Sequence, residues 1–226
     1  YIYCYNIVAG NISDAWYDNI TLVPTSQLTA SATSRLPSSR LVVGGNMVYN
    51  GDFSYIPSTN TPQTTASAWL NGSVGGSSTQ KEFGWAIPTS GVTASASAVF
   101  DITTLYNSKP TLKLSTLDAS GVIVVAQSDI ASNPSTFSNN IVLKPSTSYT
   151  LTGYIKTSNV ASSSAYIDFR EFSGTGTAVA TTSSTKLSGT NDFTLVTLTI
   201  TTQATTSFGM ILLRNFVTGN VGSAWF

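Results

Sequence analysis

The chain has no histidine among its 226 residues and only one cysteine, Cys4. Without histidine, neither a Ser-His or Cys-His catalytic pair nor a histidine-liganded zinc site can form. A single cysteine excludes an internal disulfide framework and leaves the redox compartment undecided. These two absences exclude histidine-dependent nucleophilic catalysis and a disulfide-stapled fold.

Charge and long apolar runs are also scarce. Only 9% of the residues are charged, and the ten basic and ten acidic residues cancel. The chain therefore lacks the basic footprint of a protein that binds nucleic acid or an anionic membrane. No apolar run approaches the roughly 18 residues of a membrane span. We expect no nucleic-acid partner, no membrane insertion, and a location outside the cell, at a cell surface or at a virion surface.

The few acidic residues are scattered along the chain. A glycosidase needs two carboxylates that face one cleft, roughly 5–9.5 Å apart. The one close pair within a predicted strand, Asp168 and Glu171, has opposite strand parity, so the two side chains should point to opposite faces. We therefore predict that the chain is not an enzyme.

The sequence is rich in short segments that alternate between apolar and polar residues. Period-two alternation is typical of half-buried antiparallel strands, and it occurs at 149–157, 164–172 and 193–202. The continuous apolar run at 121–127 predicts a strand that is covered on both faces. Because turn signals separate these runs, we predict an all-β antiparallel β-sandwich, or jelly roll, with little or no helix.

A similar sequence motif occurs at both ends of the chain. A shift of 209 positions places residues 1–17 on residues 210–226 without a gap, and seven of the 17 pairs are identical. We interpret the chain as a window from a longer tandem array. Residues 1–27 would be the closing hairpin of a preceding repeat, 28–40 a linker, and 41–226 a jelly roll that lacks its last strand. The alternative is a coincidental hairpin pattern.

Several motifs resemble carbohydrate-binding modules of the family 4, 9 and 22 type, which are galactose-binding-like jelly rolls. "NMVYNGDFS" (46–54) is similar to their opening, "IVLKPSTSYTLTGYIKT" (141–157) to their middle signature, and "DAWYDNITL" (14–22) to their closing strand. The long insert at 55–82 departs from a compact member of these families. The resemblance implies a module that binds glycans without cleaving them, as one repeat of a larger surface protein.

A sugar site needs flat apolar rings and polar groups on a rigid surface. The predicted strand at 164–172 presents that mixture on its outward face, and in the resembled families the groove crosses the concave sheet. The alternative is that these rings pack under the loop at 55–82 or against a neighbouring repeat. The predicted carbohydrate-binding residues are Tyr154, Tyr166, Asp168, Arg170 and Phe172.

Asp18 lies on the same strand parity as Trp16, Ile20 and Leu22. An unpaired carboxylate on an apolar face would be costly to bury, so it needs a partner. The resembled modules often hold a structural calcium ion between the closing strand and the Asn-Gly-Asp phrase. Hard oxygen donors suit calcium, so the predicted ligands are Asn50, Asp52 and Asp18. The alternative is that Asp18 faces solvent at a frayed strand end.

Two functions from different classes remain open. The first is a non-catalytic carbohydrate-binding or adhesion repeat whose partner is a glycan. The second is a structural jelly-roll repeat or filament subunit that contacts neighbouring repeats or copies of itself. A jelly roll without its last strand would expose an unpaired edge, so we predict that residues 1–22 pair with the next molecule by strand donation. The alternative is that this hairpin belongs to a preceding repeat.

Overall fold

The computed structural model describes residues 47, 48, 50–54, 56, 60–64, 85, 87, 93, 95–126, 141–216, 219 and 221–226. The chain divides into two compact units, Tyr1–Arg35 and Leu36–Phe226, and all described residues belong to the second. The predicted hairpin at 1–27, the predicted linker at 28–40 and Asp18 therefore lie outside the described residues.

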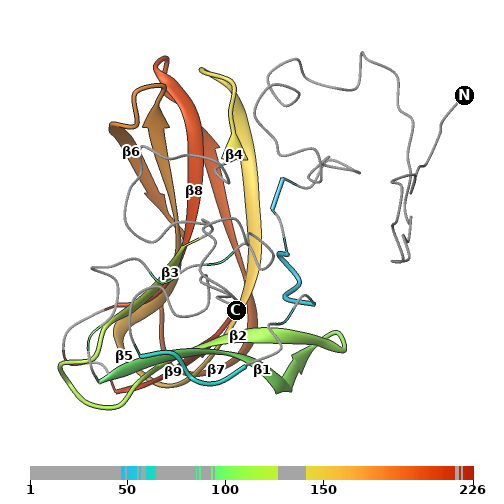
Figure 1. Cartoon of the computed structure of the whole chain (residues 1–226), viewed down its shortest axis with the longest axis vertical. Helices are drawn as coiled ribbons and strands as arrows, with labels where there is room; N and C mark the ends of the chain where they lie inside the picture. Colours follow the sequence, from blue (N-terminus) through green and yellow to red (C-terminus); the bar gives the residue numbers. More distant parts are fainter. Residues whose placement is uncertain are drawn as a thin grey trace, which may run out of the picture. The chain divides into compact units, whose positions relative to one another are not determined.

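The described residues form nine strands, and every ladder between these strands is antiparallel (Figure 1). The part of the chain that the structure describes contains no helix, so the predicted all-β antiparallel fold is confirmed. The strands are β1 (Ala96–Tyr106), β2 (Lys109–Thr116), β3 (Ile123–Ala126), β4 (Ile141–Val142), β5 (Ser148–Ser173), β6 (Ala178–Ser183), β7 (Leu187–Thr201), β8 (Thr206–Asn215) and β9 (Gly222–Trp225).

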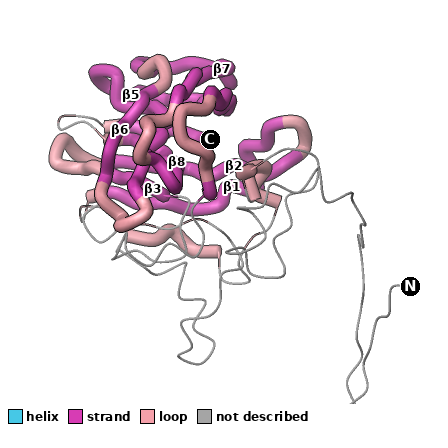
Figure 2. The backbone as a smooth tube through the Cα atoms, turned by 90° about the horizontal axis from the view of Figure 1, so that it is seen from above, coloured by secondary structure: helices cyan, strands magenta, loops and turns pink. Residues whose placement is uncertain are grey.

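The long strand β5 connects the two halves of the sandwich. The strand order is β1-β2-β9-β5-β8-β3, while β6 and β7 also pair with β5 and β4 pairs with β8. The first half of β5 pairs with β7 and briefly with β9, and its second half pairs with β8 and β6. In Figure 1 the β1–β2 hairpin lies across the lower end of the upright strands, and Figure 2 shows the same arrangement from above.

Residues that alternate between apolar and polar in the sequence alternate between buried and exposed in the structure. In β7, Val196, Leu198 and Ile200 are buried in the main core, while the intervening threonines are exposed, as predicted. Strand β3 is buried along its whole length, which confirms a strand covered on both faces. Its Ile123 and Val125 join the main core, whereas its Val124 and Ala126 join a second small cluster with Leu212 of β8.

A tight turn joins β1 to β2 and fixes the position of Tyr106. Tyr106 pairs with Lys109, and the two residues between them, Asn107 and Ser108, have φ values of 48° and 63°. Two successive residues with positive φ form the turn whose twist matches that of a two-stranded hairpin. Tyr106 is therefore held at the tip of the hairpin.

Among the described residues, no helix is long and apolar enough to cross a membrane.

Candidate functional site

Three aromatic side chains gather on the surface where β1, β5 and β7 meet. We call Tyr106, Tyr154 and Phe193 the aromatic patch. The Tyr106 and Tyr154 rings are stacked, with centroids 4.3 Å apart, and the Phe193 ring is tilted against Tyr106 at 5.0 Å. Tyr154 is 38% exposed, and the other two rings are half-buried. The patch therefore offers flat apolar surface to solvent on a rigid sheet.

Strand register brings Phe193 to this place. On β7, Leu195 lies opposite Tyr154 and Thr194 lies opposite Ile155 of β5. A register shift follows between Ile155 and Thr157, so Phe193 lies beside Lys156 instead of continuing the regular ladder. The Lys156 ammonium lies 5.6 Å from the centre of the Phe193 ring, a cation–π distance. The irregularity thus places an aromatic ring and a cation side by side.

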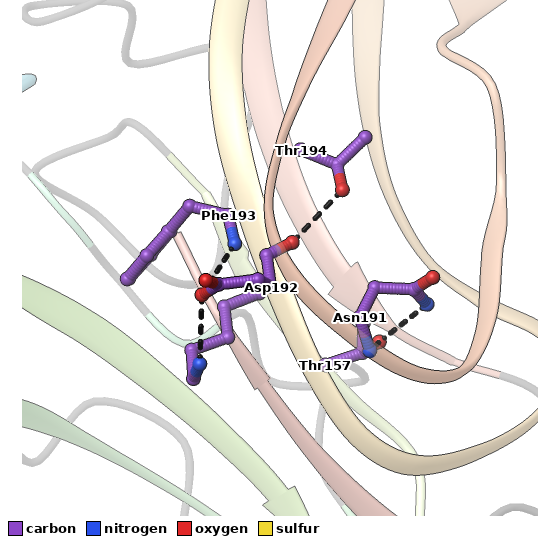
Figure 3. A network of polar contacts seen from close by, with 6 residues as sticks. Thr157, Asn191, Asp192, Phe193 and Thr194 are labelled. Atoms are coloured by element: carbon purple, nitrogen blue, oxygen red, sulfur yellow. Dashed lines mark hydrogen bonds and ion pairs between the residues drawn. The ribbon is translucent and has the colours of Figure 1, made fainter.

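Polar groups surround the backbone of Phe193, one of the three residues of the aromatic patch (Figure 3). Lys156 Nζ donates to Asp192 Oδ1 at 2.9 Å, and the same carboxylate oxygen accepts the backbone N–H of Phe193 at 2.9 Å. The Thr194 hydroxyl donates to the Asp192 carbonyl oxygen at 2.8 Å. Nearby, the Asn191 amide donates to the Thr157 hydroxyl at 2.8 Å. The Lys156 and Asp192 bonds hold one ammonium and one carboxylate beside the Phe193 ring.

The ionisation of this region is set by its hydrogen bonds. The hydrogen bond from Lys156, reinforced by the Phe193 N–H, lowers the pKa of Asp192 below its ordinary value. The hydrogen bond between Tyr106 and Tyr154 raises the pKa of Tyr106. At neutral pH the patch therefore combines an ionised acceptor with a protonated phenol. Such a surface can stack on an apolar ring face and exchange hydrogen bonds with hydroxyl groups.

Of the five residues predicted to bind carbohydrate, only Tyr154 belongs to the aromatic patch. The other four lie on the second half of β5, where Tyr166 is 8%, Asp168 4% and Phe172 3% exposed. Arg170 is half-buried. The expectation that this face of 164–172 points to solvent is therefore wrong for three of its four residues.

The physical reason is that β5 has neighbours on both edges here. Asp168 forms an ion pair with Arg214 of β8 and accepts a hydrogen bond from the Ser183 hydroxyl of β6 at 2.5 Å. The Tyr166 ring lies between Lys186, whose ammonium is 4.5 Å from the ring centre, and Arg214 at 5.9 Å. Burial raises the pKa of Tyr166, and the nearby Arg214 opposes that shift. Side chains of β6, of β8 and of the β6–β7 connection thus cover this face.

Asp168 and Glu171 have separate structural partners. The Glu171 carboxylate accepts the Gln203 N–H at 3.0 Å and the Thr206 hydroxyl at 2.6 Å. Because Asp168 pairs with Arg214 instead, the two acids do not share partners. Glu171 therefore fixes the turn that leads into β8.

The structure describes two of the three predicted calcium ligands, Asn50 and Asp52. The Asn50 carbonyl oxygen accepts the Trp85 indole N–H at 3.0 Å and the Phe53 N–H at 3.2 Å. The Asp52 carboxylate lies 3.4 Å from Lys109 Nζ and accepts hydrogen bonds from Ser54. No group of three acidic or thiol ligands occurs among the described residues, and Asp18 lies outside them. An ion held by this set would have to displace Lys109 from Asp52, and calcium binding stays a prediction.

Sequence reasoning missed Tyr106, Phe193 and Asp192. Tyr106 directly precedes the turn in "LYNSKP", whereas Asp192 and Phe193 lie inside β7, where the segment 193–202 begins with an irregular alternation at Leu195. Their meeting depends on the β5–β7 register shift and on the β1–β2 turn. An aromatic residue directly before an Asn-containing turn is the signal that could have identified Tyr106.

No protein-family model matches the chain, and no curated protein gives a significant match. Several solved structures are similar to part of the chain. The tailspike protein 4 enzymatically active domain of bacteriophage CBA120 matches with a TM-score of 0.45 and 16% identity over 63% of this chain. The match spans 18% of the tailspike chain's length.

Carbohydrate-binding modules, the group that the sequence resembles, are also among the similar structures. A family 16 carbohydrate-binding module matches with a TM-score of 0.41 and 15% identity, over 62% of this chain and 84% of the module. A xylan-binding domain of carbohydrate-binding module family 22 matches with a TM-score of 0.39 and 13% identity, over 75% of this chain and 92% of that domain. These likenesses concern the fold and assign no ligand to this chain.

Proposed function

We propose that the chain is a non-catalytic carbohydrate-binding module and that the aromatic patch is its sugar-contacting surface. The observation that carries this proposal is the exposed Tyr154 ring, stacked on Tyr106 and flanked by Phe193. Pyranose rings present apolar C–H faces, which pack on aromatic rings, and equatorial hydroxyls, which need donors and acceptors at the ring edge.

The polar edge of the patch supports the same ligand class. Lys156 supplies N–H donors, and the ionised Asp192 carboxylate supplies acceptors, directly beside the Phe193 ring. Asp192 is highly exposed, so its outer oxygen surface remains accessible to a ligand hydroxyl. A neutral oligosaccharide fits this balanced pair of charges better than a nucleic acid, because polyanions need a basic surface.

An oligosaccharide array of the full chain tests this proposal. We expect saturable binding that the Tyr154→Ala and Phe193→Ala substitutions weaken by about tenfold or more, equivalent to about 1.4 kcal/mol. Leu117→Ala is the matched control, because Leu117 is exposed and lies outside the patch. Absence of binding by the folded wild-type chain would overturn the proposal.

We place the protein outside the cell or on a virion surface as an adhesion module. The supporting observation is a sequence in which only 9% of the residues are charged and Ser, Thr and Asn are abundant. Secretion into the medium or presence on purified particles, detected with an antibody to the chain, tests this location. An exclusively cytosolic distribution would contradict it.

A further inference from the structure

Exposed hydroxyl side chains occupy the outer face of the β5–β7 pair, directly beside the aromatic patch. On β7 they alternate with the core residues Val196, Leu198 and Ile200, so they point away from the core. Each of them lies directly opposite another hydroxyl residue on the neighbouring strand. We call these three exposed pairs the hydroxyl face: Ser148 with Thr201, Thr150 with Thr199, and Thr152 with Thr197.

The hydroxyl face continues the aromatic patch in register. The next pair along the same two strands is Tyr154 with Leu195, and these side chains are 38% and 53% exposed. From Ser148 to Tyr154 the strand advances six residues, or about 20 Å. The aromatic end and the hydroxyl end therefore form one uninterrupted strip on a single pair of strands.

The hydroxyl face is uncharged and its side chains are available to a ligand. Each hydroxyl can donate one hydrogen bond and accept two, and each threonine adds an apolar methyl group. Within the described part of the chain, none of the six hydroxyls bonds to another residue. Threonine is also stiff at χ1, so little rotamer freedom is lost when a ligand orders it. The face thus offers evenly spaced polar contacts at a low entropic cost.

The direction across the strands offers much less to the same ligand. Lys156 of β5 pairs with Trp225 of β9, and Trp225 pairs with Lys113 of β2. Trp225 is only 9% exposed, and its indole N–H donates to Asp101 Oδ2 at 2.8 Å. The Lys113 ammonium lies 4.9 Å from the centre of the Trp225 ring. A ligand that left the patch in this direction would meet two lysines and a covered indole.

We infer that the hydroxyl face binds the sugar units that follow the one held by the aromatic patch. The ligand is then a linear, neutral oligosaccharide that lies along β5 and β7. This inference rests on the proposed sugar-binding function of the patch and names its ligand class. An anionic sugar unit would lose hydration on the hydroxyl face without gaining a cation. Hydroxyl residues that recur about every 7 Å along each strand suit a polymer that presents hydroxyls repeatedly.

Affinity should therefore increase with the length of the oligosaccharide. Short oligosaccharides fill the aromatic end of the strip, and longer ones also reach Thr197 and Thr199. The double variant Thr197→Val with Thr199→Val removes two hydroxyls and keeps the shape of both side chains. Valine is also a strong strand former, so this variant should fold like the wild type.

Calorimetric titration of the full chain with cello-, xylo- and manno-oligosaccharides of two to six units tests the inference. The measured quantity is the ratio of the association constants of the hexasaccharide and the disaccharide. We expect the hexasaccharide to bind the wild type about tenfold or more tightly than the disaccharide does. The double variant should lose most of this gain, because two hydrogen bonds between neutral groups together account for about tenfold in affinity.

Thr181→Val is the matched control, because Thr181 is exposed on β6 and lies outside the hydroxyl face. A longer chain also offers more binding frames, so the comparison of the two variants decides. Equal ratios in the control and the double variant would overturn the inference and leave the proposed function standing. Binding of charged or branched glycans alone would do the same. If the folded wild type bound no glycan at all, the proposed function would fail, and this inference with it.

Discussion

The Tyr106 and Tyr154 rings stack with their centroids 4.3 Å apart, although the two residues belong to strands on different hairpins of the fold. The tight turn at Asn107 and Ser108 holds one ring, and the middle of the first half of β5 holds the other. This contact makes one continuous aromatic surface out of two separate strands. The proposed sugar-binding function depends on that surface.

The Asp168–Arg214 ion pair should be the most sensitive polar contact in the fold. Both side chains are largely buried, at 6% and 12% exposure. Removing one partner leaves a buried charge without compensation, so Asp168→Ala should lower the free energy of unfolding by about 3–5 kcal/mol. Urea denaturation measures this change.

The exposed pair Lys156–Asp192 is the control for that experiment. Asp192→Ala should change the free energy of unfolding by about 1 kcal/mol or less, because solvent screens exposed pairs. The double variant Asp168→Leu with Arg214→Met should recover most of the lost stability. Equal effects of Asp168→Ala and Asp192→Ala on the free energy of unfolding would show that burial does not determine how much these ion pairs contribute to stability.

Asp101 should make the fold sensitive to acid. Burial alone would raise its pKa, but hydrogen bonds from Thr103, Thr104 and Trp225 outweigh burial and hold the pKa well below its ordinary value of 3.8. A carboxyl group with a lowered pKa in the folded state contributes its full stability above its unfolded pKa. That contribution is lost as the pH falls towards the folded pKa.

The free energy of unfolding should therefore decrease below about pH 4 and should decrease less steeply in Asp101→Asn. Chemical denaturation at a series of pH values measures both slopes. Parallel curves for the two proteins would contradict this role of Asp101.

Gly209 should not tolerate a side chain. A Cβ at this position would collide with the Phe169 ring and would come within 2.8 Å of Leu143 Cδ1. Overpacking of this kind typically costs about 1–3 kcal/mol, so Gly209→Ala should lower the thermal midpoint. Phe169→Leu should relieve part of the loss in the double variant. A Gly209→Ala protein as stable as the wild type would show that the ring moves freely.

Calcium binding by Asn50, Asp52 and Asp18 is tested by the thermal midpoint of the chain with chelator and with added calcium. An ion that binds only the folded state raises the midpoint. We expect this rise in the wild type and its loss in Asp52→Ala. An unchanged wild-type midpoint would refute the calcium site.

The sequence predicts which segments form strands better than it predicts which strand faces are exposed to solvent. Alternation in β7 and the apolar run of β3 predicted burial correctly, because side-chain direction in a strand depends only on parity. Strand parity also placed the side chains of Tyr166 and Asp168 on the face of β5 opposite the core residues Ile167 and Phe169. It could not predict that β6 and β8 would cover this opposite face, because the neighbours of a strand are determined by the topology of the sheet.

The candidate site was predictable only at Tyr154. Its partners Tyr106 and Phe193 come from turns and from a register shift between β5 and β7. Neither feature leaves a periodic pattern in the sequence. The aromatic patch is thus a product of strand pairing between distant segments.

The measurement that tests the central proposal most directly is a calorimetric titration of the full chain with the oligosaccharide that binds most strongly on the array. Wild type, Tyr154→Ala and Tyr166→Phe are compared. The account predicts that Tyr154→Ala weakens binding by about tenfold or more, while Tyr166→Phe binds like the wild type. Unchanged affinity in Tyr154→Ala together with lost affinity in Tyr166→Phe would place the sugar on the covered face of β5 and contradict the account.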